Sequence, residues 1–175
     1  MAGHNKWKQI KVKKGVLDKK RSALFSKLLK AITVAARDEE KPEFNPRLKA
    51  ALERAKQSNV PQENIERAIK KVRERAQSLE EITIEAYGPG GAAVIIEAIT
   101  DNRNRTVQEI KLMLKNNGGR IAEPGATSWA FEKNGEEWRP KFKQELGNGD
   151  KEKTEKLLAT LEELEDVQKV YTNLP

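Results

Sequence analysis

Cysteine is absent from this sequence, and histidine occurs once, at His4 in a lysine-rich segment. Without cysteine the chain can form no disulfides, thiolate metal ligands or thiol nucleophiles, and we expect it in a reducing compartment, the cytoplasm. A single histidine excludes a multi-histidine metal site and argues against a Ser-His-Asp relay. We therefore expect no enzyme, no metal and no cofactor, and no small-molecule substrate is evident.

Long apolar runs are lacking as well. The longest, Ala92–Ile99, includes Glu97 and is far shorter than the roughly 20 residues of a membrane-spanning helix, so no membrane partner is expected. Aromatic residues make up only 5% of the 175 residues, against 35% charged residues. The cores should therefore be small and aliphatic, in one large domain or two small ones.

The net charge of +7 is concentrated at the N-terminus. Residues 1–37 hold eleven lysines and arginines against one acid, a net of +10, whereas residues 38–80 sum to +1 and residues 81–175 to −4. A basic segment of this kind is typical of proteins that bind a polyanion such as DNA or RNA. The alternative is a solvated lysine tail that only aids solubility.

The first fifteen residues place Trp7, Ile10 and Val12 among lysines without helical spacing, which predicts an extended or irregular arm. Trp7 can either stack on a base or anchor the arm to the helices behind it, while the cations neutralise phosphates. No recognition-helix or aromatic RNA-binding signature accompanies them, so sequence-specific readout is not indicated. The candidate nucleic-acid-binding residues here are Lys6, Trp7, Lys8, Lys11, Lys13, Lys14, Lys19, Lys20 and Arg21.

Three helices are expected in the first half of the chain. Apolar residues recur at helical spacing from Val16 to Arg37. Asn45-Pro46 and Asn59-Val60-Pro61 are typical helix starts, and they predict a second helix and a third that runs to about Ala76. We expect the arm and this three-helix bundle to form a first domain, residues 1–77.

After Ser78 the apolar spacing changes from helical to alternating, which indicates strands. We expect a second domain, residues 78–175, in the order ββαβαβ: an α+β sandwich with its helices on one face of the sheet. Residues 88–91 should form a hairpin turn, because no Gly-Lys-Ser/Thr follows as it does in a phosphate-binding loop. Residues 134–150 have no clear period and are expected to be a shortened connection. The expected elements are strands 82–87, 92–100, 127–131 and 167–171 and helices 106–117 and 157–164.

The segment Asp101–Thr106 lies where a strand is expected to end and a helix to begin. Asn104 or a neighbour can cap the helix, and backbone N–H groups there can meet an anion. Arg103 and Arg105 are therefore further candidates for binding phosphate. The alternative is a capping turn in which Asp101 pairs with one of the two arginines.

Several segments together resemble the YebC family. Each is unremarkable alone, but eight of them in the family's order are specific to it and run nearly from end to end of the chain. They are residues 1–4 with Lys6-Trp7 and Ile10-Lys11, then 32–37, 45–48, 64–70, 87–91, 100–107 and 115–119, and finally 166–168 with 170–173.

The resemblance implies an N-terminal helical domain, a central α+β domain and a third domain inserted before the last helix and strand of the second. Only residues 134–150 remain where the third domain should lie, so the chain is similar to a short form that lacks it. Val12 and Asn5 stand where members usually carry histidine and serine.

Members of this family are described as cytoplasmic DNA-binding transcriptional regulators, a mitochondrial branch activates translation, and others are similar to ribosome-associated factors. The resemblance thus implies a non-enzymatic nucleic-acid-binding regulator of gene expression, with transcription regulation as the family's label. The alternative is translation regulation through ribosomal RNA, and a protein adaptor that uses the acidic C-terminal half is a third hypothesis. The residues themselves indicate polyanion binding and do not choose between DNA and RNA.

Overall fold

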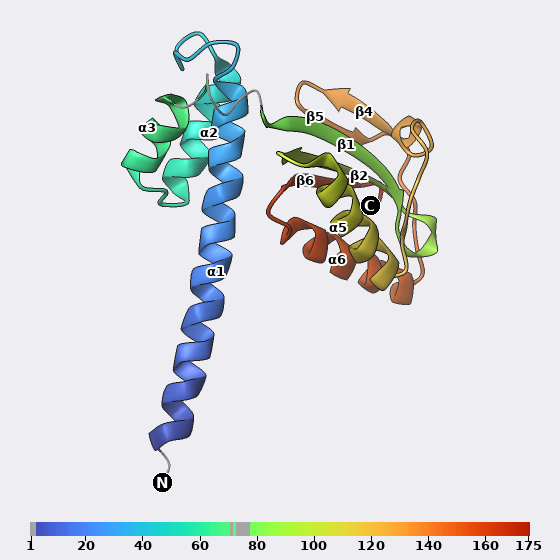
Figure 1. The fold of residues 1–175 in the computed structure, drawn as a ribbon. Coiled ribbons are helices and arrows are strands. Elements are labelled where there is room, and N and C mark those ends of the chain that lie inside the picture. The colour runs from blue at the N-terminus through green and yellow to red at the C-terminus, as the bar shows by residue number, and fades with distance from the viewer. Residues whose placement is uncertain (1–2, 71, 73–77) are drawn as a thin grey trace. The chain divides into compact units, whose positions relative to one another are not determined.

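The computed structural model describes the backbone of residues 3–70, 72 and 78–175, and the side chains from residue 11 onward within those ranges. The chain divides into two compact units, residues 1–76 and residues 77–175 (Figure 1). The first is helical, and the second combines helices with antiparallel sheets, so the expected α+β class is confirmed. The sequence analysis places the domain boundary one residue further on, between residues 77 and 78.

Asn45 joins the first two helices of the helical unit. Helix α1 spans Gly3–Ala35 and helix α2 spans Pro46–Gln57. The Asn45 side-chain oxygen accepts a hydrogen bond from the Leu48 N–H at 2.9 Å, and its amide nitrogen donates to the Ala35 carbonyl at 2.7 Å. One side chain therefore caps α2, as predicted from the Asn-Pro start, and ties it to the end of α1.

Small residues allow the three helices of this unit to pack closely. Helix α3 spans Gln62–Lys70, and its predicted extension to Ala76 falls almost wholly outside the described residues. Ile32 of α1, Leu48 of α2 and Ile65 of α3 meet in the core, where alanines fill the space between the larger side chains. The fully buried members of this core include Ile32, Ala36, Leu48 and Ala55.

The predicted irregular arm is wrong, because residues 3–15 belong to α1. Lysine and glutamine are good helix formers, and the segment contains no proline, so nothing interrupts the helix from Gly3 onward. Residues 11–22 are all exposed, so this part of the helix needs no apolar stripe. Without such a stripe, helical spacing could not be recognised in the sequence. The helix also ends at Ala35 instead of the predicted Arg37.

The second unit is built on a four-stranded antiparallel sheet in the order β3-β1-β2-β6. Strand β1 (Glu80–Tyr87) pairs with β2 (Ala93–Thr100), and the turn between them is the predicted one. Gly90 adopts a φ of 67° in this turn, a conformation that favours glycine. The outer strands are β6 (Val167–Thr172), beside β2, and β3 (Arg120–Ile121), which the sequence did not predict.

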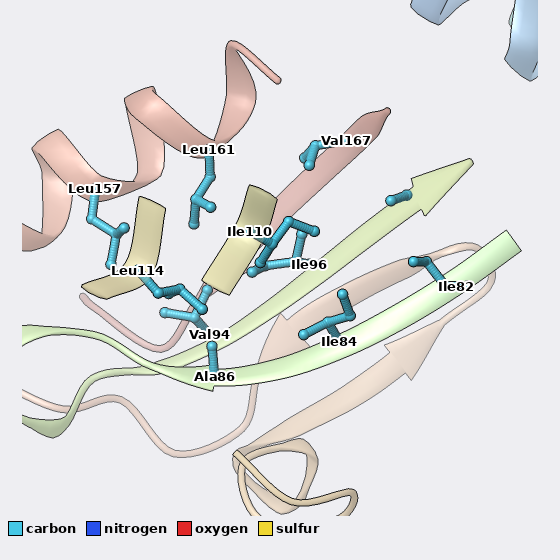
Figure 2. Packing of buried hydrophobic residues seen from close by; sticks show 11 residues of the cluster. Ile82, Ile84, Ala86, Val94, Ile96, Ile110, Leu114, Leu157, Leu161 and Val167 are labelled. Atoms are coloured by element: carbon cyan, nitrogen blue, oxygen red, sulfur yellow. The ribbon is translucent and has the colours of Figure 1, made fainter. Parts of the chain in front are cut away.

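Two helices cover one face of this sheet, as expected. Helix α5 spans Arg103–Asn116 and helix α6 spans Asn148–Glu162. Figure 2 shows the leucines of α6 and Ile110 and Leu114 of α5 directed toward the inward-facing side chains of β1 and β2. Because side chains alternate along a strand, every second residue of β1 and β2 points into this core. Its strand members are Ile82, Ile84, Ala86, Val94, Ile96, Ala98 and Val167.

A β-hairpin packs against the opposite face of the sheet. Strand β4 (Phe131–Asn134) pairs with β5 (Glu137–Pro140). Phe131 is buried with Ile95, and the Trp138 indole N–H donates to the Glu97 carboxylate at 2.9 Å. Residues 134–150 are therefore more than a connection, because they include β5 and the start of α6.

Glu85 explains why the predicted strand 127–131 is wrong. The Glu85 carboxylate accepts backbone N–H bonds from Gly125, Thr127 and Ser128 at 2.7 to 2.8 Å, so these residues turn around it instead of pairing in a sheet. The strand begins only at Phe131. Burial alone would raise the pKa of Glu85, but the backbone donors outweigh it and lower the pKa to about 2.

Glu85→Gln should destabilise the second unit at neutral pH, because an amide oxygen accepts from three backbone donors less strongly than a carboxylate does. We expect the free energy of unfolding to fall by about 1–3 kcal/mol. In the wild type the same stabilisation is present above the unfolded pKa of about 4.5 and is lost as the pH falls toward 2. Thermal unfolding followed by tryptophan fluorescence measures both effects.

The matched control is Glu132→Gln, which neutralises an exposed carboxylate on β4. It should leave the unfolding transition within about 0.5 kcal/mol of the wild type. Equal transitions for Glu85→Gln and the wild type near neutral pH would contradict the role given to Glu85.

Candidate nucleic-acid interface

The N-terminal part of α1 presents the predicted cations to solvent. Every residue from Lys11 to Ser22 is exposed, and this stretch holds six basic side chains against one acid, Asp18. Among the described side chains, the apolar contacts of α1 with the bundle core begin at Phe25, and the exposed part extends past α2 and α3 (Figure 1). The six described cations are Lys11, Lys13, Lys14, Lys19, Lys20 and Arg21.

The cations lie all round the helix. At 3.6 residues per turn, positions seven apart share a side, so Lys13 is above Lys20 and Lys14 above Arg21. Lys11 lies on the side opposite to Lys13 and Lys20. A polyanion can therefore contact this helix from several directions at once.

Apolar side chains are exposed among these cations. Val12 and Leu17 are each 66% exposed and Val16 is 51% exposed. Val12 and Val16 lie one turn apart, so they form a short apolar strip beside the lysines. The side chains of Lys6, Trp7 and Lys8 lie outside the described residues, so the choice between stacking and anchoring for Trp7 stays open.

A groove of about 420 Å³ opens between α1 and α3 at the base of this exposed stretch. The Arg21 guanidinium carbon lies 5.1 Å from the centre of the Phe25 ring, a cation–π contact on the wall of the groove. Asn64 contributes a polar side chain from α3. The groove thus extends the basic surface toward the bundle. Its lining consists of Asp18, Arg21, Ser22, Phe25, Ser26, Leu29 and Asn64.

The strand-to-helix corner after β2 engages both predicted arginines in ion pairs. Asn102, a neighbour of the predicted Asn104, caps α5 and accepts from the Arg105 N–H at 3.1 Å. The Arg105 guanidinium pairs at 2.8 Å with Asp101 and also with a more distant carboxylate, Asp166. These hydrogen bonds, first to Asp166 and then to Asp101, raise the pKa of Arg105 further above its ordinary value.

Asp166 is the member of this corner that sequence reasoning missed. It is only 3% exposed, and its carboxylate accepts the Thr106 hydroxyl at 2.5 Å as well as the guanidinium of Arg105. Thr106 Oγ1 also lies 2.8 Å from Thr100 Oγ1 at the end of β2. The contacts join residues some 60 positions apart, so no local pattern could have revealed them.

Arg103 differs from Arg105 in its surroundings. Its guanidinium pairs with Glu80 at 2.6 Å, and both side chains are more than half exposed. A phosphate could replace Glu80 at that position with little loss, since exposed pairs contribute little stability. Phosphate binding by either arginine stays a prediction.

Other types of site find no support in the described ranges. Within residues 3–70, 72 and 78–175 no group of three or more histidine, aspartate or glutamate side chains could hold a metal ion. In the same part of the chain no helix is long and apolar enough to cross a membrane. Two acids near the sheet have structural partners, Trp138 for Glu97 and Arg105 for Asp101.

Nearly the whole chain matches the domain models of one protein family. The model of the TACO1/YebC protein N-terminal domain matches residues 5–75, and the model of the TACO1/YebC second and third domain matches residues 79–137 and 134–174. The chain belongs to the TACO1/YebC family. The two pieces of the second match meet at the β4–β5 hairpin, where the sequence predicts the third domain to be missing.

Curated relatives agree with this assignment. A protein named "Probable transcriptional regulatory protein" from Petrotoga mobilis is 51% identical over 138 residues, and one of the same name from Geotalea uraniireducens is also 51% identical. The matches cover 77% of this chain and 55% and 56% of the two relatives, so the chain spans about half their length.

One solved structure resembles the fold closely. It is the crystal structure of a conserved hypothetical protein, Aq1575, from Aquifex aeolicus, with a TM-score of 0.80 and 34% sequence identity. The match covers 89% of this chain and 90% of that one. The two-unit α+β fold is therefore one that a related sequence adopts.

Arg105→Ala should destabilise the second unit, because it leaves the buried Asp166 carboxylate without its cation. We expect a loss of about 1–3 kcal/mol in the free energy of unfolding. Arg103→Ala is the matched control, and it should cost less than about 1 kcal/mol because the Arg103–Glu80 pair is exposed. Chemical denaturation followed by circular dichroism compares the two variants. Equal losses in the free energy of unfolding would show that the pair with Asp166 does not make Arg105 more important for stability than Arg103.

Proposed function

We propose that this protein is a non-enzymatic, nucleic-acid-binding regulator of gene expression, and that the exposed part of α1 carries the contact. The observation that supports it is the stretch Lys11–Ser22, a helix with six cations, one acid and every residue exposed. A solvated helix with this charge would gain little by folding on its own, since its cations repel one another. Contact with phosphates relieves that repulsion and releases counterions.

The arrangement of the cations suits a groove of a nucleic-acid duplex. An α-helix fits the major groove of B-form DNA, which has a phosphate backbone on each side. Cations all round the helix can reach both backbones, with Lys13 and Lys20 toward one and Lys11 toward the other. Contacts of this kind position the protein without reading bases, so affinity should depend strongly on salt and weakly on sequence.

Transcription regulation is the first candidate role. It is supported by the names of curated relatives about 50% identical to this chain. Translation regulation through ribosomal RNA is the alternative, because α1 offers phosphate contacts that both polymers can use. Crosslinking the protein in cells and sequencing the nucleic acid it holds separates the two: promoter DNA supports the first role, and ribosomal RNA supports the second.

Replacing Lys11, Lys13 and Lys14 together by alanine should weaken binding to duplex DNA of any sequence. Each lysine–phosphate contact adds about 0.9 to the magnitude of the slope of log K against log salt, so three lost contacts should flatten the slope by up to about 3 units. Fluorescence anisotropy with a labelled duplex, measured at several salt concentrations, gives both the affinity and the slope.

The matched control removes the same charge from another helix. Lys151, Lys153 and Lys156 are exposed on α6, and their replacement by alanine should leave affinity and slope nearly unchanged. If the two triple variants lost equal affinity, net charge alone would account for binding. If the α1 variant bound as tightly as the wild type with the same slope, the assignment of α1 would be wrong.

A further inference from the structure

Two large aromatic side chains are exposed side by side on the second unit. Trp129 is 63% exposed and Phe142 is 50% exposed, and their ring centres lie 5.6 Å apart with the planes tilted by 41°. The pair lies where the chain enters and leaves the β4–β5 hairpin. Exposed apolar side chains that lie together, and not singly, are a feature of many binding surfaces.

The indole of Trp129 is held in place. Its Nε1–H donates to the Ala126 carbonyl at 2.9 Å, and the same carbonyl accepts the Tyr87 hydroxyl at 2.9 Å. Ala126 itself lies in the turn that Glu85 holds through the N–H groups on either side of it. The ring is thus fixed before any ligand arrives, which lowers the entropy that binding would cost.

The second ring is anchored through its backbone. The Phe142 N–H donates to the Ala130 carbonyl at 3.1 Å, next to Trp129 in the chain, and the Asn173 amide donates to the Phe142 carbonyl at 3.3 Å. Lys141 also donates its N–H to Ala130, at 2.8 Å. The two aromatic residues therefore sit on segments joined directly to each other.

One cation lies against the aromatic pair, and a second lies against Tyr87, whose hydroxyl shares the Ala126 carbonyl with the Trp129 indole. The Lys141 ammonium lies 5.4 Å from the centre of the Phe142 ring, and the Arg120 guanidinium lies 4.6 Å from the centre of the Tyr87 ring. In the part of the chain that the structure describes, neither cation forms an ion pair. Positive charge therefore lies on Phe142 and on the neighbouring Tyr87, although the residues from 81 onward have a net charge of −4.

We propose that Trp129 and Phe142 form a stacking platform for an unpaired base of single-stranded RNA, with Lys141 and Arg120 placed to contact its phosphates. Every base has a flat face that can stack on an aromatic ring, and adjacent cations attract the backbone. Unpaired bases are the features of RNA that proteins bind by stacking. The inference rests on the proposed function, nucleic-acid binding, and of its two ligands it favours RNA.

A second copy of this chain fits the platform less well. A two-fold contact would place Trp129 and Phe142 of both copies together, but it would also bring each Lys141 and Arg120 close to the same cations of the other copy. Like charges in such a contact repel, whereas phosphates are attracted. Charge complementarity thus favours the nucleic acid.

The test compares full-length wild type with Trp129→Ala in binding a labelled oligouridylate of about 12 nucleotides. We expect roughly tenfold weaker binding by the variant, since one stacking partner is lost. The salt slope should not change, because no charge is removed. Trp129→Phe should retain most of the affinity, since it keeps a flat ring.

Two controls isolate stacking from other effects. Leu112→Ala removes an exposed apolar side chain from α5 (52% exposed) and should bind like the wild type. An abasic ribose-phosphate strand of the same length should bind wild type and Trp129→Ala equally. Circular dichroism should show that Trp129→Ala keeps the wild-type fold, as expected for an exposed residue.

Several outcomes would overturn the platform. They are unchanged oligouridylate affinity of Trp129→Ala, an equal loss on the abasic strand, or wild-type dimers in sedimentation equilibrium that Trp129→Ala converts to monomers. The lysine variant of α1 separates this inference from the proposed function. If the α1 variant loses affinity and Trp129→Ala does not, the role of α1 is supported and the platform is wrong. If only Trp129→Ala loses affinity, the platform is supported and the role of α1 is wrong.

Discussion

A charged side chain can leave water only if an opposite charge or several hydrogen bonds replace its hydration, and this constraint shapes both units of the protein. In α1, six cations face one acid between Lys11 and Ser22, too few carboxylates for the helix to be packed against a core. Among the described side chains, the apolar core of the bundle therefore includes α1 only from Phe25 onward. The surface that makes α1 a candidate for nucleic-acid binding follows from the same shortage.

The second unit satisfies this constraint at carboxylates that lie on the sheet or next to it. Asp166 is buried because Arg105 and the Thr106 hydroxyl replace its hydration. Glu85 is held by backbone N–H groups, and Glu97 accepts from the indole of Trp138. The outer face of the sheet can thus carry two acids and still be covered. Anchoring the covering segments in this way also holds the loop that presents Trp129 to solvent.

The two exposed surfaces lie in different parts of the match to the TACO1/YebC family. The basic part of α1 lies within the match to the family's N-terminal domain, residues 5–75. Trp129 and Phe142 lie on either side of the hairpin where the two pieces of the second match meet. This chain, which spans about half the length of the curated relatives it matches, thus has one cationic and one aromatic surface, on different units.

The sequence by itself determined the features that depend on neighbouring residues. Asn45-Pro46 predicts a capped helix start because the cap bonds to an N–H three residues on, and the glycines after Tyr87 predict the hairpin turn because they allow positive φ. Apolar alternation likewise predicts β1 and β2, whereas polyanion binding by the lysine-rich segment stays a prediction. All these signals lie within a few residues of the structure that they specify.

Only the tertiary structure decided the features that depend on distant partners. The arm before Val16 is helical without an apolar stripe, and periodicity detects a helix only where it packs on something. The turn at residues 125–128 forms around Glu85, about forty positions earlier, so the local β propensity near Thr127 was misleading. The turn around Glu85 also holds Trp129, through the Ala126 carbonyl. Arg105 is held by Asp166, about sixty positions away. Hydrogen bonds and charge pairs depend on distance in space, and that distance is set when the chain has folded.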